Sequence, residues 1–224
     1  MLHTRLLFVL VSIGMLAGAL CSGGCESNDQ LRMQGRLALQ KGDLEQAETK
    51  LSRAVDNEST DWESQWLLGR TYLAQNRPLD ARSSLARAWA VRGHGPETPQ
   101  IVDDLAEAHL RGGENDRLSL VLQEAADRYG TAYDFMRQGN YLSKIGDVDN
   151  AQLAYRTAAR FTAPDDTEPW LKLADLYEAH QDHQKAVEAL QTAYRIKPTD
   201  PRIERRLRLL GEIPGPTLPA PPAE

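Results

Sequence analysis

Small and large apolar residues recur along this chain in a pattern with a period of about 34 residues. Within each period, position 8 is glycine or alanine, and positions 20 and 27 are alanine in nearly every copy. The larger apolar residues at position 24 are Leu51, Leu85, Leu122, Tyr155 and Leu190. Positions 20, 24 and 27 fall on one face of a helix, where small residues allow a second helix to approach closely. The pattern therefore predicts antiparallel helix pairs, repeated along most of the chain.

The turn between the two helices of each period also repeats. Position 15 is occupied in turn by Gly42, Asn76, Gly113, Gly146 and Gln181. Glycine and asparagine readily enter the left-handed region that ends a helix, so four of these five turns are predicted to use it. Position 16 is acidic in every copy except the second, and we expect that acid to cap the second helix.

The last period carries the most complete pattern. Its residues at the repeated places are Trp170, Leu173, Ala174, Tyr177, Ala186, Leu190, Ala193 and Pro198. This pattern resembles the tetratricopeptide repeat family, over five units at residues 28–61, 62–95, 99–131, 132–165 and 167–200. The resemblance implies an all-α fold, a right-handed α-α superhelix of helix-turn-helix repeats.

The third unit departs furthest from the family pattern. It has His109 and Leu118 where the family usually has an apolar or aromatic residue and alanine, and it follows a short insertion at residues 93–98. We expect a bend or a local irregularity of the superhelix at this place. His109 is interpreted as a packing residue rather than a general base.

A final amphipathic segment, residues 201–211, is predicted to be a helix that covers the open end of the array. Asp200 and Pro201 are typical of a helix start, and Ile203, Leu207 and Leu210 fall on one face. Its arginines could form a basic patch for acidic lipid or nucleic acid, but we favour an ordinary solvated face. The Pro-rich tail, residues 212–224, is expected to be disordered or extended.

The N-terminal residues predict export. Arg5 precedes an uncharged apolar stretch at residues 6–20, which is the layout of a signal peptide, here residues 1–24. Cys25 follows small residues and resembles the acceptor of a bacterial lipoprotein, with residues 25–27 as a tether, although Ser22 replaces the usual branched apolar residue. Cleavage after Ala19, giving a soluble exported protein, and an uncut membrane anchor remain alternatives. In all three cases we expect the repeats to lie in the cell envelope, facing the periplasm.

Composition and charge limit the remaining functions. The net charge is −6, from 26 basic and 32 acidic residues, which does not favour general nucleic-acid binding. His180, Asp182 and His183 lie together at a predicted turn but lack the third protein ligand that a catalytic zinc site needs. We therefore predict no catalytic residues, no metal and no cofactor.

The resemblance also implies a concave groove lined by positions 2, 5, 9 and 12 of each unit. The residues at these places, as carried over, are Arg32, Arg36, Leu39, Trp66, Arg70, Leu73, Asp103, Glu107, Leu110, Tyr133, Met136, Asn140, Leu171, Asp175 and Glu178. We predict that an extended or helical segment of a partner binds there, with its acidic or C-terminal part at Arg32, Arg36 and Arg70. The alternative is that these charged residues belong to ordinary solvent-exposed helix faces and bind no partner. Asp103 and Glu107 replace the basic residues of the family's carboxylate clamp, so such a clamp is not predicted.

The sequence thus predicts a scaffold that binds other proteins, with envelope assembly as the process suggested by analogy with the family. Two alternatives stay open. One is an accessory subunit or an unrecognised enzyme of cell-wall metabolism, and the other is a self-associating structural protein.

Overall fold

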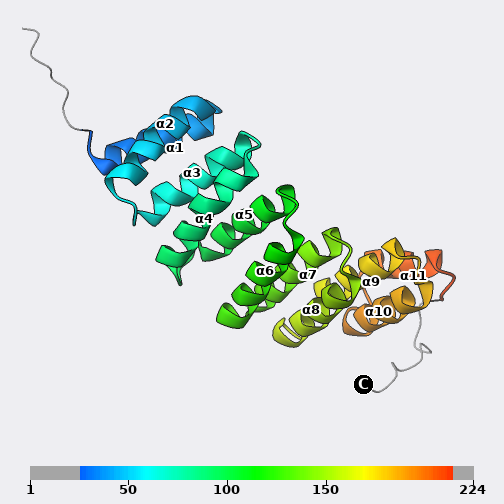
Figure 1. Ribbon diagram of the computed structural model, residues 1–224. Coiled ribbons are helices and arrows are strands. Elements are labelled where there is room, and N and C mark those ends of the chain that lie inside the picture. Colours follow the sequence, from blue (N-terminus) through cyan, green and yellow to red (C-terminus); the bar gives the residue numbers. More distant parts are fainter. Residues whose placement is uncertain (1–25, 214–224) are drawn as a thin grey trace, which may run out of the picture.

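The computed structural model describes residues 26–213, which form eleven helices and contain no strand (Figure 1). The helices are α1 (Asn28–Lys41), α2 (Leu44–Asn57), α3 (Trp62–Ala74), α4 (Pro78–Arg92), α5 (Thr98–Arg111), α6 (Asn115–Tyr129), α7 (Ala132–Lys144), α8 (Val148–Phe161), α9 (Glu168–Ala179), α10 (His183–Ile196) and α11 (Pro201–Leu209). The predicted signal peptide, Cys25 and residues 214–224 of the tail lie outside the described residues.

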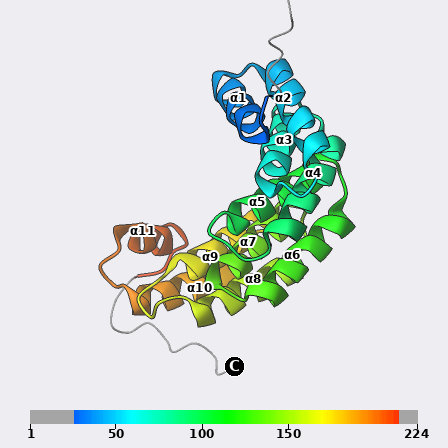
Figure 2. The same cartoon turned by 90° about the vertical axis from the view of Figure 1, so that its left-hand side faces the viewer.

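The first ten helices form five antiparallel pairs, stacked in a row. Seen from the side, the row is a crescent, with α1, α3, α5, α7 and α9 on its inner side and the second helix of each pair on its outer side (Figure 2). The predicted α-α superhelix of five repeats and a capping helix is confirmed. No helix within residues 26–213 combines the length and apolar character needed to cross a membrane.

In the first, second and fourth repeats, the helices of a pair cross where glycine at position 8 meets the large residue at position 24. A Cβ atom added at Gly35 or Gly69 would lie 2.5 Å from Cγ of Leu51 or Leu85, and one at Gly139 would lie 2.5 Å from Cε1 of Tyr155. These are closer than any ordinary carbon contact, so only glycine permits this separation. The alanines at positions 20 and 27 are buried beside each crossing. The sequence pattern thus translates directly into the distance between helices.

All five turns at position 15 adopt the left-handed conformation, including the one that the sequence excluded. Gln181 has a φ of 60°, close to the 58° of Asn76. The Gln181 N–H donates to the carbonyl of Glu178 at 3.1 Å, and the next N–H donates to that of Tyr177 at 2.9 Å. The other turns close with the same pair of bonds. Closing the helix pair therefore outweighs the cost of about 1–2 kcal/mol for a residue with a side chain in this region.

The acids at position 16 cap the second helix in three repeats but not in the third. Asp43, Asp147 and Asp182 each accept a backbone N–H three residues on, at 3.1, 3.3 and 3.1 Å. Glu114 makes no such bond, which corrects the expectation for that repeat. Its carboxylate instead pairs with Arg82 and lies 3.0 Å from Nδ1 of His109, which is buried.

Helix α11 covers the end of the array. Ile203 and Leu207 are completely buried against the fifth repeat, and Leu210 packs at the edge of the same cluster. Asp200 caps the helix by accepting the N–H of Arg202 at 2.9 Å. The Arg202 guanidinium beside Asp200 lowers the pKa of that carboxyl to about 2. The arginines of this helix, for which an ordinary solvated face was favoured over a basic patch, are largely paired with acids of the chain: Arg202 with Asp200, Arg206 with Asp175 and Glu178, and Arg208 with Glu204.

Candidate protein-binding surface

The inner face of the crescent presents the residues that were predicted to line a groove, because it is formed by the first helices of successive repeats (Figure 2). Most of these side chains contact a neighbouring repeat. The contacts decide which of them are free to meet a ligand.

Two arginines of α1 reach across to the second repeat. The Arg32 guanidinium lies 2.7 Å from a carboxylate oxygen of Asp61 and 3.1 Å from one of Glu63, and it also pairs with Asp29. Arg36 pairs with Glu63. The side chain of Arg32 is 24% exposed, whereas that of Arg36 is 48% exposed. Arg32 is thus a joint between repeats, and Arg36 keeps part of its guanidinium facing solvent.

Trp66 and Arg70 of α3 converge on one carboxylate of α5. The Trp66 indole donates to Asp104 at 2.7 Å, and Nε of Arg70 lies 3.8 Å from the same group. The Arg70 guanidinium also lies 5.5 Å from the centre of the Trp66 ring. Burial raises the pKa of Asp104 above its ordinary value, although the hydrogen bond from Trp66 acts in the opposite direction. Arg70 remains about half exposed, at 49%.

The middle of the inner face is held by contacts between α5 and α7. The Tyr133 hydroxyl donates to Asp103 at 2.6 Å, a bond that raises the pKa of Tyr133 to about 12. The Tyr141 hydroxyl donates to the backbone carbonyl of Asp103 at 3.1 Å. Glu107 pairs within its own helix, with Arg111 at 2.6 Å. Tyr133 nevertheless stays 53% exposed, so its ring is available to a ligand.

Towards the C-terminal end, most of the polar groove residues are already bonded. Asn140 accepts a hydrogen bond of 3.0 Å from the Tyr155 hydroxyl. Asp175 and Glu178 pair with Arg206 of α11 at 2.8 and 2.9 Å. Met136 is partly buried against the core of the last two repeats.

The arrangement differs from the sequence-based expectation in two respects. Arg32 and Arg36, which were predicted to meet an acidic part of a ligand, pair instead with acids at the start of the second repeat. Leu73 and Leu171, which were assigned to the groove, are buried at 9% and 6% exposure, because these places pack against the adjacent helices. The predicted residues with substantial exposure on the inner face therefore include Arg36, Arg70 and Tyr133.

Sequence reasoning missed the partners that hold these side chains. Glu63 and Asp104 occupy different places in their repeats, and Arg206 lies in the capping helix α11, so no single position of the pattern marks them. The sequence feature that could have indicated these pairs is an acidic residue in the first helix of the repeat that follows each arginine, Glu63 after Arg36 and Asp104 after Arg70. Within residues 26–213, no three His, Cys, Asp or Glu side chains are grouped as metal ligands would be.

Comparison with known proteins identifies the repeat. A family model described as tetratricopeptide repeat matches residues 32–95 and 136–201. The comparison with curated proteins gave no match.

Several solved structures are similar to the described fold. The MamA protein has 19% identity and a TM-score of 0.60, with 88% of this chain and 99% of that chain covered. YrrB, described as a tetratricopeptide repeat protein with an unusual peptide-binding site, has 16% identity, a TM-score of 0.57 and coverages of 84% and 94%. The C-terminal part of a repeat protein from Cytophaga hutchinsonii has 16% identity, a TM-score of 0.62 and coverages of 84% and 76%. At these identities the likeness concerns the fold alone.

Proposed function

The chain belongs to the tetratricopeptide repeat family, and from this premise we propose that it is an adaptor whose inner face holds a segment of another protein in the cell envelope. The repeat fold is that of a protein–protein interaction scaffold, and its partners are proteins or peptides. The segment, its chemistry and the compartment belong to the proposal.

One observation carries the choice of surface. Two half-exposed guanidinium groups lie on the inner face beside α3: that of Arg70 is placed over the partly buried ring of Trp66, and that of Arg36 pairs with Glu63, three residues before Trp66. Each guanidinium has five N–H donors in a planar fork, so a single carboxylate partner within the protein leaves donors for a ligand. Arginine and tryptophan are also the side chains most enriched at binding hot spots.

The chemistry of the bound segment follows from this surface. An acidic side chain or a C-terminal carboxylate meets Arg36 and Arg70, and apolar side chains of the same segment meet Trp66 and Tyr133. Before binding, Asp103 holds Tyr133, Asp104 holds Trp66 and Arg70, and Glu63 holds Arg36. A surface arranged in advance loses less conformational entropy when it binds.

The proposed function is tested by charge reversal on the inner face. The variant Arg36→Glu with Arg70→Glu changes the net charge by −4. The variant Arg87→Glu with Arg117→Glu makes the same change on exposed residues of the outer helices α4 and α6. Crosslinking in intact envelopes followed by mass spectrometry identifies the partner, and capture of that partner is then compared between variants. We expect capture to be lost only with the inner pair. Equal capture by both variants, with unchanged circular dichroism, would exclude this surface.

The proposed location is an envelope membrane, through a lipid on Cys25. It is supported by the apolar stretch at residues 6–20 and the small residues before Cys25. At the start of the described chain, Glu26 pairs with Lys50 and Arg53, and Ser27 caps α1. A lipid on Cys25 therefore holds the first repeat close to the membrane.

A pair of cysteine variants tests this location. Cys25→Ser is expected to move the protein from the membrane fraction to the soluble fraction and to abolish incorporation of labelled fatty acid. Cys21→Ser, four residues earlier in the sequence, is expected to change neither. Fatty acid incorporation that persists in Cys25→Ser would rule out this acceptor.

A further inference from the structure

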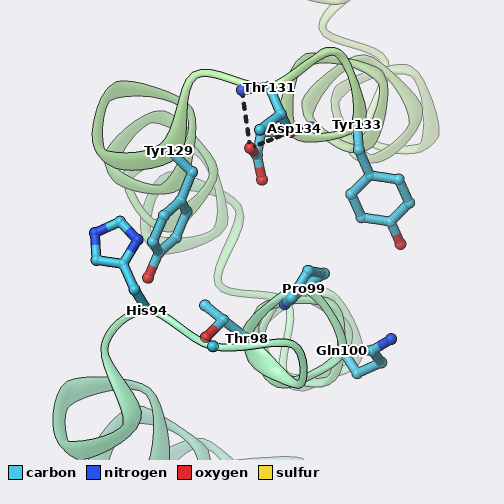
Figure 3. Close-up of a pocket in the computed structure, with 9 residues that line it drawn as sticks. His94, Thr98, Pro99, Gln100, Tyr129, Thr131, Tyr133 and Asp134 are labelled. Atoms are coloured by element: carbon cyan, nitrogen blue, oxygen red, sulfur yellow. Dashed lines mark hydrogen bonds between the residues drawn. The ribbon is translucent and has the colours of Figure 1, made fainter.

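The loop between the second and third repeats forms one wall of a cavity of about 480 Å³ (Figure 3). His94 of this loop lies on one side with Tyr129 from the end of α6, and Tyr133 from the start of α7 lies on the other. Thr98 and Pro99, at the start of α5, lie between them. The cavity is thus at the edge of the array where first helices begin, at the place where the repeat pattern is interrupted.

The walls of the cavity are held in place by hydrogen bonds. The Tyr129 hydroxyl accepts from the Trp89 indole at 2.7 Å and donates to the carbonyl of Gly93 at 3.1 Å. The Thr98 hydroxyl donates to the same carbonyl at 2.8 Å. The His94 ring meets the Tyr129 ring edge-on, with centres 4.8 Å apart. Loop and aromatic ring are therefore fixed relative to each other.

The one buried charge at the cavity needs no ligand. Asp134 is 4% exposed and accepts the Thr131 N–H at 3.1 Å and the Thr131 hydroxyl at 2.5 Å. Its other carboxylate oxygen pairs with Arg137, which is also buried. A cationic ligand would thus gain no free carboxylate here. The cavity presents the tyrosine rings and the Pro99 ring to a ligand, and these surfaces suit an uncharged, apolar group.

We propose that this cavity binds the proline-rich C-terminal segment, residues 214–224, of a second copy of the chain. The segment contains five prolines, and Pro216, Pro219 and Pro222 are spaced three residues apart. In a polyproline II helix, which has three residues per turn, these three rings fall on one side. Grooves lined by aromatic side chains recognise such segments, whose conformation is already restricted before binding. This contact uses neither Arg36 nor Arg70, but it shares Tyr133 with the proposed adaptor surface. Charge reversal at Arg36 and Arg70 therefore tests the adaptor surface without altering the cavity.

The position of the chain end indicates a second copy as the source. Gly211 has a φ of 84°, and the N–H groups of Gly211 and Glu212 donate to the carbonyls of Arg208 and Leu207. Arg206, near the end of α11, pairs with Asp175 and Glu178, near the end of α9, so α11 ends at the same edge as that first helix. The cavity lies at the opposite edge, about 20 Å away along a helix as long as α5 or α7, and two repeats back. Eleven residues of polyproline II span only about 34 Å, which leaves little reach within one molecule.

Peptide binding tests the cavity. A fluorescein-labelled peptide of residues 212–224 is titrated, by fluorescence anisotropy, into residues 26–213, which contain every described helix and cap. We expect saturable binding that is lost when Pro216, Pro219 and Pro222 of the peptide become alanine. Tyr133→Ala is expected to weaken binding about tenfold, whereas Tyr133→Phe, which keeps the ring, retains it. Leu153→Ser, at an exposed residue of α8, is the matched control.

Light scattering tests the second copy. Residues 26–224 are expected to gain mass with concentration, and residues 26–213 are expected to stay monomeric. Absence of peptide binding, or binding that depends on Leu153 and not on Tyr133, would overturn the cavity assignment. If residues 26–224 stay monomeric at every concentration, binding of the tail by a second copy is excluded. This also holds if the labelled peptide fails to bind residues 26–224 because the chain's own tail occupies the cavity.

Discussion

The Trp66 indole donates a 2.7 Å hydrogen bond to Asp104, which belongs to the next repeat. The same carboxylate lies 3.8 Å from Arg70, whose guanidinium is placed over the Trp66 ring. One partly buried acid of α5 thus joins two repeats and also orients the two side chains of α3 that we assign to partner binding. Structural and recognition roles meet at this carboxylate.

Replacing Asp104 by asparagine tests how much the ionised Asp104 carboxylate lowers the stability of the folded protein. Burial raises the pKa of Asp104 in the folded protein, so ionisation is less favourable there than in the unfolded chain. The contribution of the wild-type carboxyl to stability is therefore lost as the pH rises through the folded-state pKa. Asparagine keeps an acceptor for Trp66 and carries no charge. We compare the free energy of unfolding of Asp104→Asn with that of the wild type at each pH. We expect this difference to favour the variant more at neutral pH than below pH 3.8, the ordinary pKa of the carboxyl. Urea denaturation at several pH values measures the difference, and a difference independent of pH would contradict this reasoning.

The close crossing of α3 and α4 predicts a penalty for the smallest enlargement at Gly69. A methyl group there would lie 2.5 Å from Cγ of Leu85, so Gly69→Ala must displace a buried side chain. Overpacking of this kind costs about 1–3 kcal/mol, from which a gain of about 0.5–1 kcal/mol in helix propensity is subtracted. We expect a net loss of about 1–2 kcal/mol in chemical denaturation.

A double-mutant cycle provides the control for Gly69→Ala. In the Leu85→Ala background the two shortest contacts are removed and only the Ala81 carbonyl remains close, at 3.3 Å, so the same substitution is expected to carry a much smaller penalty. If the penalty has the same size in both backgrounds, the contact between Gly69 and Leu85 is not its cause.

The turn at Gln181 holds a residue with a side chain in the left-handed region. Gln181→Gly is expected to stabilise the protein by about 1 kcal/mol because the backbone strain is removed. Gly146→Gln is the reciprocal change, at a turn where an added Cβ meets nothing within 4 Å, so only strain is introduced. It is expected to destabilise by a similar amount. Thermal unfolding of both variants compares them, and shifts in the same direction would refute the assignment.

His109 predicts a loss of stability in weak acid. It is buried against Glu114, and burial lowers the pKa of His109 below its ordinary value of 6.5. Below that value the unfolded chain takes up a proton that the folded protein resists, so stability falls as the pH falls. His109→Gln removes this group. We expect the wild type to lose more stability than the variant between about pH 7.5 and 5.5. Parallel curves for the two proteins would show that His109 is not responsible.

The architecture could be predicted from the sequence because it depends on contacts within one repeat. Gly35 and Leu51, or Gly69 and Leu85, are separated by a fixed number of residues, and the pattern records that spacing directly. The exception at Gln181 arises because the geometry of the helix pair, rather than the turn residue, sets the backbone there.

The chemistry of the inner face depends on contacts between repeats, which the pattern does not record. Arg32 was predicted to meet a ligand but pairs with Asp61 and Glu63, whose positions relative to it depend on how one repeat is rotated against the next. Glu114 was predicted to cap a helix but pairs with Arg82 of the preceding repeat. Export, lipidation of Cys25 and the partner stay predictions.

Site-specific photocrosslinking tests most directly the claim that the inner face is the recognition surface. A photoreactive amino acid is placed at Arg36 or Arg70 on the inner face, or at Arg87 on the outer helix α4, in the intact chain in its native envelope. The account predicts the same discrete protein adduct from both inner positions and none from Arg87. An adduct formed equally from Arg87, or from Arg87 alone, would contradict it.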